Sequence, residues 1–345
     1  MNGLTVLFTG AGSSMGQSVL KAFLASKYSK ESRIIITNSE PGGAGFFLSG
    51  LVNACFVVPI AKDPCYSETI EKICLSEGVN VIFSGTEHEI SVLSSLKSKF
   101  REKYNIHIAL SEPNIVDIGT DKMKTWEFFH RFGLPFPQTE LLANYKKLVE
   151  MCGFPLFMKP RTASASRNVF RIDNEEQLWK FQFAAEDEII LQTYIDSDIE
   201  YTVEVYCDKT GAIAGIIPMR RCLEYGLSIS GEIDNCMAAI KVSQRVAEAL
   251  RPQGALNVQL KIVGSEAIPF EINTRFSSTE CIRAYYGFNS VEAEIDHYVY
   301  NKPINLSNYR TGRFMRYWEE CYFSDEAYDT LIETGCLKRE QRRSV

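Results

Sequence analysis

The sequence predicts two architectures in succession: a doubly wound α/β domain over residues 1–112, followed by an antiparallel α+β body. The first prediction rests on the opening of the chain, where an apolar strand at 4–9 runs into the glycine turn GAGSSMG and then into a helical pattern. The second rests on 255–273, where two strands of alternating polarity form a hairpin pattern. A chain of 345 residues is long for a single core, so two or three domains are expected.

Further elements follow in order along each part. In the first domain, strands are predicted at 33–39, 54–60, 79–85 and 106–111, and helices at 17–27, 67–78 and 87–101. In the second body, the pattern predicts a helix at 121–132 and then a strand–loop–strand element within 152–172. Two strands joined at Asp-Ser-Asp are predicted within 189–206, and a further strand at 212–221. A helix containing 243–250 follows, and a strand within 313–323 is expected to close the sheet.

Composition excludes several classes of protein. Apolar residues make up 45% of the chain, and a net charge of −6 gives no indication of nucleic-acid binding. The ten cysteines lie singly and none of the four histidines has zinc-ligand spacing, so a structural zinc site is not expected and a reducing cytoplasm is. The N-terminus lacks the features of a signal peptide and no apolar run approaches 18 residues, which predicts a soluble cytoplasmic protein without a membrane partner.

The hairpin carries an unusual set of polar side chains. A three-residue turn at Gly264–Glu266 would place three pairs opposite one another: Val263 and Ala267, Gln259 and Glu271, and Asn257 and Asn273. The acid and the amides then share one face, and the other face is filled by Val258, Leu260, Ile262, Ile268, Phe270 and Ile272.

This polar face has the chemistry of a metal site. Mg²⁺ prefers oxygen ligands, and Glu271 and Asn273 with Gln259 behind them could hold an ion that also binds nucleotide phosphates. Arg275, just beyond, could neutralise a transferring phosphoryl group. The alternative interpretation is a solvent-facing polar surface with cross-strand hydrogen bonds.

A second segment, LFMKPRTASASRNVF, predicts a phosphate loop. Lys159 stands at the root of a tip of small residues that contains Ser164 and Ser166, where backbone N–H groups could approach phosphate oxygens. The alternative is an ordinary hairpin tip. The segment does not have the GxxxxGK[ST] pattern, so such a loop belongs to another class.

Five segments in order resemble the ATP-grasp superfamily: IGTDKMKTWEFFHRFGLPFPQT, FPLFMKPRTASASRNV, LQTYIDSDIEYTVEV, ALNVQL and PFEINTRFS. Within this superfamily the chain resembles single-copy proteins similar to the carbamoyl-phosphate synthase large subunit. The resemblance implies a Rossmann-like pre-ATP-grasp domain at 1–112, an N-terminal lobe at 113–190, a C-terminal lobe with the Mg-ATP site at 191–300, and a strand and helix at 301–345 that close the domain.

The resemblance also implies residue roles. Phosphate contacts fall on Lys122, Lys159 and the tip serines, the adenine hinge on Gln192, Thr193, Tyr194 and Ile195, and the ribose acceptor on Glu200. Magnesium ligands fall on Gln259, Glu271 and Asn273, and the arginine beside the transferred phosphate on Arg275. A further phosphate contact falls on Arg220 or Arg221, which the resemblance does not separate, and Arg283 matches an arginine that faces the substrate carboxylate.

The chain departs from the family pattern at three places. The tip TASASRNV has no glycine, which raises the question whether turnover is slowed or lost. Thr193 stands where an acid is common, and Thr274 stands where the NPR triplet has proline. The metal ligands and both lysines are retained.

The implied activity is an ATP- and Mg²⁺-dependent ligase, with Mn²⁺ as an alternative ion, that joins a small carboxylic acid to an amine through an acyl phosphate and releases ADP and phosphate. A single ATP-grasp unit cannot run the two successive phosphorylations of carbamoyl-phosphate synthesis. The alternative is a nucleotide-binding protein without turnover. The partners implied are small-molecule acid and amine substrates, and a homodimer stays open.

A rival hypothesis starts from the turn TGAGSSMG, which resembles that of short-chain dehydrogenases with a nicotinamide cofactor. A YxxxK match exists at Tyr298 and Lys302, but Pro303 follows directly and opposes a continuing helix. Only Glu40 could serve as a ribose acceptor after the second strand. The turn is better explained by domain packing or by a place on the substrate side of the cleft.

Overall fold

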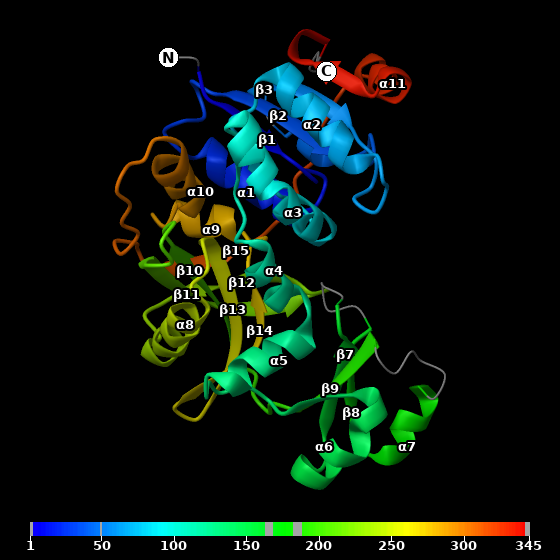
Figure 1. Ribbon diagram of the computed structural model, residues 1–345, viewed down its shortest axis with the longest axis vertical. Helices are drawn as coiled ribbons and strands as arrows, with labels where there is room; N and C mark the ends of the chain where they lie inside the picture. The colour runs from blue at the N-terminus through cyan, green and yellow to red at the C-terminus, as the bar shows by residue number, and fades with distance from the viewer. Residues whose placement is uncertain (1–2, 49, 163–167, 182–187, 342–345) are drawn as a thin grey trace.

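The computed structural model describes residues 3–48, 50–162, 168–181 and 188–341, and it begins with a six-stranded sheet in the order β16-β3-β2-β1-β4-β5 (Figure 1). All pairings among the first five strands are parallel, which confirms the predicted α/β domain. Its elements are β1 Thr5–Phe8, α1 Ser14–Leu24, β2 Arg33–Asn38, β3 Val52–Val57, α2 Tyr66–Glu77, β4 Val81–Phe83, α3 Glu87–Tyr104 and β5 His107–Ile108.

Alternation along β1 explains why both faces of this sheet are covered. Val6 and Phe8 join the buried cluster that contains Val19 and Phe23 of α1, while Leu7 joins the cluster with α2 and α3 on the other side. A strand that buries both faces has no polar side and reads as a continuous apolar run.

The second body is built on an antiparallel six-stranded sheet in the order β14-β13-β10-β11-β12-β15. Its strands are β10 Glu200–Cys207, β11 Ile213–Glu224, β12 Leu227–Ile233, β13 Gly254–Val263, β14 Glu266–Asn273 and β15 Gly312–Met315. Helices α4 Pro113–Thr120, α5 Lys122–Arg131 and α8 Met237–Leu250 contact this sheet and bury its apolar side. The sequence patterns did not predict β12.

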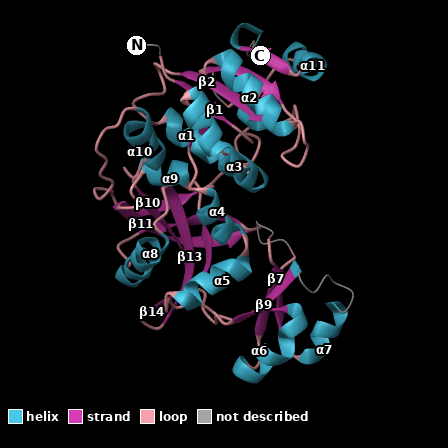
Figure 2. Ribbon diagram, in the orientation of Figure 1, coloured by secondary structure: helices cyan, strands magenta, loops and turns pink. Residues whose placement is uncertain are grey.

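A smaller sheet forms a separate lobe beside it, with strand order β6-β9-β7-β8 (Figure 2). The strands are β6 Thr139–Leu141, β7 Leu156–Pro160, β8 Phe170–Ile172 and β9 Ile189–Thr193, with helices α6 Tyr145–Cys152 and α7 Glu175–Leu178. The antiparallel pairing of β7 with β8 confirms the strand–loop–strand prediction. Because β9 and β10 belong to different sheets, the segment between them connects the two lobes.

The register of the β13–β14 hairpin is confirmed at one end and wrong at the other. Gln259 lies opposite Glu271 and Asn257 opposite Asn273, as predicted. The turn is one residue shorter than predicted, however, since Val263 pairs with Glu266, and an irregularity between Gln259 and Leu260 restores the register. This bulge shifts the alternation by one residue, so Ala267 and Pro269 are buried, whereas Phe270 is only partly buried and lines a cavity.

The C-terminal segment is divided between the two bodies. β15 extends the large sheet, but only 313–315 of the predicted 313–323 strand belongs to it. Helix α11 Asp325–Thr334 then leads to β16 Cys336–Lys338, which pairs antiparallel with β3 at the edge of the first sheet. Between β14 and β15 the chain forms α9 Glu280–Tyr285, α10 Ser290–Glu294 and the π-helix η5 Ile295–Val299. The short 3₁₀ turns are η1 Ala44–Phe46, η2 Leu142–Asn144, η3 Trp179–Phe181 and η6 Arg339–Gln341. No helix in the described ranges is long and apolar enough to cross a membrane.

Candidate functional site

A cavity of about 540 Å³ is lined by residues from all three sheets. The first domain contributes Ser13–Met15 and Gly85–His88, which follow the carboxyl ends of β1 and β4. Strand order reverses between these two strands, and ligands of open α/β sheets bind at such a point. The small lobe contributes β7 and β9, and the large sheet contributes β10, β11, β13 and β14.

Glu271 lies in the cavity wall, and its surroundings favour the charged form. Burial alone would raise the pKa of this carboxyl, but the ammonium groups of Lys122 and Lys159 and a hydrogen bond from Asn273 lower the pKa below its usual value. Asn273 donates from Nδ2 to Glu271 Oε1 at 3.1 Å. Together with Gln259 opposite Glu271, this is a set of hard oxygen donors that fits Mg²⁺.

Lys159 is buried at the same wall. Its Nζ donates to the carbonyl oxygen of Phe270 at 3.3 Å. Phe270 is the residue that the hairpin bulge displaces. Burial lowers the pKa of Lys159 to about 8, although Glu271 raises it. Lys122 begins α5, where Asp121 caps the helix by accepting from the Met123 amide, so its place follows from helix capping. Two ammonium groups beside one carboxylate suit a polyphosphate.

The structure separates the two adjacent arginines that the sequence could not. Arg221 lines the cavity, with 10% of its side chain exposed, and donates to Glu200 Oε1 from Nε at 3.0 Å and from Nη2 at 2.6 Å. The same Nη2 donates to Gln259 Oε1 at 2.9 Å. Arg220, 47% exposed, does not line the cavity and pairs with Glu232 instead. A strand alternates its faces, so only one of two neighbours can point inward.

Arg275 bridges the two bodies. Its guanidinium donates to both carboxylate oxygens of Glu87, with the shortest distance 2.5 Å from Nη2 to Oε1, and the same Nη2 donates to Asn273 Oδ1 at 3.1 Å. Glu87 is the first residue of α3 and lines the cavity from the first domain. The predicted arginine therefore reaches the predicted metal ligand and a residue of the other body at once.

The hinge residues Gln192–Ile195 all line the cavity. The amides of Thr193 and Tyr194 donate to the carbonyls of Gln138 and Pro155 and are thereby engaged. The Thr193 hydroxyl, in contrast, is buried without a hydrogen-bond partner among the described residues. A buried hydroxyl in a cavity wall needs a partner, so this orphaned atom fits an incoming polar ligand at the hinge.

Two predicted site residues, Arg283 and Asn273, are placed differently from the expectation, and two others are not described. Arg283 is fully buried behind the cavity, where it pairs with Glu204 and Glu280, and a direct contact with a substrate carboxylate is not supported. Ser164 and Ser166 lie outside the described residues. Asn273 does not itself line the cavity but contacts two residues that do.

The dehydrogenase hypothesis finds no support in the geometry. Tyr298 stacks on His107, and Lys302 pairs with Asp296; neither lines the cavity. In the glycine turn, a Cβ on Gly16 would lie 2.4 Å from the carbonyl oxygen of Gly10, so glycine is required by close packing. The turn both packs the domain and presents Ser13 to the cavity, as the sequence interpretation expected.

Several cavity residues were not among the candidates of the sequence analysis: Glu87, Lys261, Ser278 and Thr279. For Glu87 the available signal was its position after the carboxyl end of a parallel strand, a place where side chains converge.

Two family models match the chain. The first, described as the PylC-like N-terminal domain, covers residues 6–108, and the second, described as ATP-grasp in the biosynthetic pathway with Ter operon, covers 185–320. The chain contains an ATP-grasp domain. The resemblance implied this domain, with two lobes, after a Rossmann-like N-terminal domain, and the match of the first body to a PylC-like N-terminal domain agrees with that order.

Individual relatives support this assignment. Carbamoyl phosphate synthase large chain of Methanosarcina mazei is 22% identical over 271 residues, which are 72% of this chain and 24% of that one. This ATP-grasp chain thus spans about a quarter of the length of the curated relatives it matches.

Solved structures share the fold. N5-carboxyaminoimidazole synthetase from Staphylococcus aureus complexed with ADP superposes with a TM-score of 0.73 at 14% identity, over 91% of this chain and 82% of that one. The biotin carboxylase domain of Hydrogenobacter thermophilus 2-oxoglutarate carboxylase, in complex with MgADP, ADP and bicarbonate, gives a TM-score of 0.68 at 15% identity, over 94% and 76%.

Proposed function

We propose that this protein is an ADP-forming carboxylate–amine ligase that uses ATP and Mg²⁺. The observation that carries the proposal is the convergence of Lys159, Glu271 and Arg275 on one cavity, opposite a hinge with an orphaned hydroxyl. Solved proteins of this fold that bind ADP or MgADP support the choice of nucleotide. The proposed partners are a small carboxylic acid and an amine; cytoplasmic location and a homodimer remain predictions from the sequence.

In this proposal each group of residues has one task. The hinge holds the adenine, with the Thr193 hydroxyl as a polar contact, and Glu200 faces the ribose once Arg221 turns to a phosphate. Lys122 and Lys159 neutralise phosphate oxygens, and Arg275 does so at the γ-phosphate. Charge neutralisation and positioning carry most of a phosphoryl transfer, because such a step needs little covalent help from the protein.

Glu271, with Asn273 and Gln259, would hold the Mg²⁺. The ion, when bound, supplies positive charge shared between the protein and the phosphates. The carboxylate of the acid then attacks the γ-phosphorus in line, the bond from this phosphorus to the β,γ-bridging oxygen breaks, and ADP leaves. The amine nitrogen next attacks the acyl carbon, phosphate leaves, and the nitrogen gives up a proton as the amide forms.

A second candidate is a nucleotide-binding protein without turnover. The ion pairs of Arg275 with Glu87 and of Arg221 with Glu200 favour it, since both arginines are neutralised by carboxylates in this conformation. The two candidates share the nucleotide site and differ in whether ADP is formed.

The experiment begins with calorimetric titration by ATP and, separately, by NADP⁺, each with and without Mg²⁺. ADP release is then screened with the twenty protein amino acids as acids and with ammonium, glycine or glucosamine as amines. Glu271→Gln should abolish Mg²⁺-dependent ADP release, whereas Glu266→Gln at the exposed start of the same strand should not. ATP binding without any ADP formed supports the second candidate, and NADP⁺ binding without ATP binding rejects both.

A further inference from the structure

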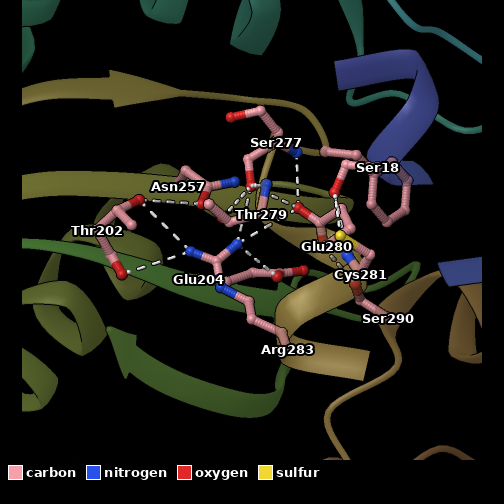
Figure 3. A network of polar contacts seen from close by, with 12 residues as sticks. Ser18, Thr202, Glu204, Asn257, Ser277, Thr279, Glu280, Cys281, Arg283 and Ser290 are labelled. Carbon is pink, nitrogen blue, oxygen red and sulfur yellow. Dashed lines mark hydrogen bonds and ion pairs between the residues drawn. The ribbon is translucent and has the colours of Figure 1, made fainter. Parts of the chain in front are cut away.

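A fully buried cluster of three charged residues lies directly behind the cavity (Figure 3). Arg283 of α9 donates from Nη1 to Glu204 Oε2 of β10 at 2.9 Å and to Glu280 Oε1 at 3.3 Å. The side chains of Arg283 and Glu204 are 0% exposed and that of Glu280 is 1% exposed. Arg283 also reaches the carbonyl and hydroxyl of Thr202, a cavity residue.

The charges of this cluster balance if it holds one proton. Two carboxylates face one guanidinium, and a buried excess charge is costly. Burial and the neighbouring Glu280 raise the pKa of Glu204 well above its usual value, and Glu204 Oε1 has no hydrogen-bond partner within the described residues. A proton on Glu204 would leave the cluster neutral.

The cluster holds the segment that follows Arg275. Glu280 Oε1 accepts from the amide of Ser277 at 2.6 Å and from its hydroxyl at 2.8 Å, and Arg283 Nη1 donates to the same hydroxyl oxygen at 3.0 Å. That oxygen also accepts from the amide of Thr279 at 3.1 Å and lies 2.7 Å from Thr279 Oγ1. The hydroxyl of Ser277 is therefore saturated and serves as an anchor.

Ser278 lies between these two anchored residues and lines the cavity. Arg316, which follows β15, donates to its carbonyl oxygen, so the peptide is held from the opposite side as well. Within the described residues, neither the amide nor the hydroxyl of Ser278 has a hydrogen-bond partner. The surrounding bonds thus hold a cavity residue whose two donors are both unengaged, three positions beyond Arg275.

We propose that Ser278 binds the carboxylate of the acid substrate and that Glu204, Glu280 and Arg283 are positioning residues that hold it there. This inference rests on the proposed function. The amide and hydroxyl of Ser278 are hydrogen-bond donors, which suit the oxygens of a carboxylate. Because these donors are held in place before the substrate binds, less conformational entropy is lost on binding. The role of Arg283 thereby changes from direct contact to positioning through Ser277.

Three variants test this arrangement. Ser278→Ala removes a presented donor, and Arg283→Lys keeps the charge but loses the planar fork that reaches Ser277 and Thr202. Ser290→Ala is the matched control, because Ser290 is equally buried and donates to the other oxygen of Glu280 at 3.0 Å, away from the segment. If Arg283→Lys does not fold, Ser277→Ala removes the same anchor with a smaller change.

The measurements are amide hydrogen exchange over 274–283, calorimetric affinity for MgADP, and KM for the amino acid that gives most ADP in the screen. Arg283→Lys should speed exchange of the Ser277 and Thr279 amides at least tenfold and raise KM about tenfold. Ser278→Ala should raise KM without changing exchange. Both should leave MgADP affinity within about twofold, and Ser290→Ala should change none of the three.

The outcomes separate this inference from the proposed function. An unchanged exchange rate in Arg283→Lys overturns the positioning role, whether or not the enzyme turns over. An unchanged KM in Ser278→Ala overturns the binding role. Failure of the wild-type protein to form ADP with the whole panel overturns the proposed function and with it the role of Ser278, while the exchange data still decide whether the buried cluster holds the segment.

Discussion

Glu87 and Arg275 are 188 residues apart in the chain and form a two-oxygen ion pair across the two bodies of the protein. Arg275 is the arginine expected at the transferred phosphate, and this pair binds it to a carboxylate of the pre-ATP-grasp domain. A phosphate that approaches Arg275 must compete with Glu87 for the same guanidinium.

Removing the charge of Glu87 should therefore strengthen binding that depends on the γ-phosphate. In Glu87→Gln, the affinity for a non-hydrolysable ATP analogue relative to ADP should rise about fivefold, which corresponds to about 1 kcal/mol for a partly exposed ion pair. Calorimetry with both nucleotides in Mg²⁺ measures this ratio, and Glu102→Gln on the exposed part of α3 is the control. A lower ratio in Glu87→Gln would show that the pair assists phosphate binding.

The adjacent arginines of β11 offer a matched pair of substitutions. Arg221→Ala should weaken MgADP binding about tenfold, since charge-assisted bonds to phosphates are strong and since Glu200 is left without its cationic partner in the cavity wall. Arg220→Ala should change the affinity less than twofold, because this residue points to Glu232 on the other side. Equal effects of the two substitutions in calorimetric titrations would reject the assignment of Arg221 as the phosphate contact.

Nucleotide affinity should depend on the protonation of Lys159. Its pKa of about 8 lies below the ordinary 10.5, so the ammonium is lost as pH rises through 8 in the free protein. Affinity for MgADP should fall about tenfold from pH 7 to 9.5 if bound phosphate raises the pKa of Lys159 by one unit, because a shift of one unit corresponds to about 1.4 kcal/mol. The free energy of unfolding changes with pH in the opposite direction to the affinity. The contribution of Lys159 to it rises between about pH 8 and pH 10.5, because in this range the unfolded chain still binds the proton that the folded protein has lost.

Lys159→Arg provides the check on this assignment. Arginine stays charged throughout the range, so the inflection near pH 8 should disappear from a plot of affinity against pH. Persistence of the inflection would place the titrating group elsewhere in the cavity.

The contrast between what the sequence predicted and what it missed follows from the range of the interactions. The pairing of Gln259 with Glu271 was predictable because alternation along both strands fixes the face. The parallel domain was predictable because its strands are mostly apolar runs separated by helical patterns. The bulge near Phe270 was not, since it depends on a turn only one residue shorter than assumed. β12 was missed because its pattern is interrupted by Gly231, where a Cβ would lie 2.1 Å from the carbonyl oxygen of Arg220.

Long-range charge pairing lies beyond any local pattern. Nothing near Glu87 in the sequence indicates Arg275, and nothing near Arg283 indicates Glu204, although both pairs decide which side chains face the cavity. Family resemblance placed Arg283 near the cavity but could not indicate its buried partners Glu204 and Glu280, because a resemblance transfers a position and not its hydrogen bonds.

If Glu204 carries the proton that its raised pKa favours, the buried cluster is neutral, and this state predicts an unusual pattern of stability. Glu204→Gln replaces a protonated acid by an amide of the same shape and should cost no more than about 1 kcal/mol, as for loss of one hydrogen bond. Glu280→Gln should also be mild, because Glu204 can then ionise and balance Arg283. The double variant leaves Arg283 without a counter-charge and should lose about 3–5 kcal/mol, as for a buried pair with one partner removed. Urea unfolding of the four proteins at pH 7 measures the coupling. Single substitutions that clearly stabilise the protein would mean that both carboxylates are charged in the native protein, because each substitution would then remove an excess buried negative charge.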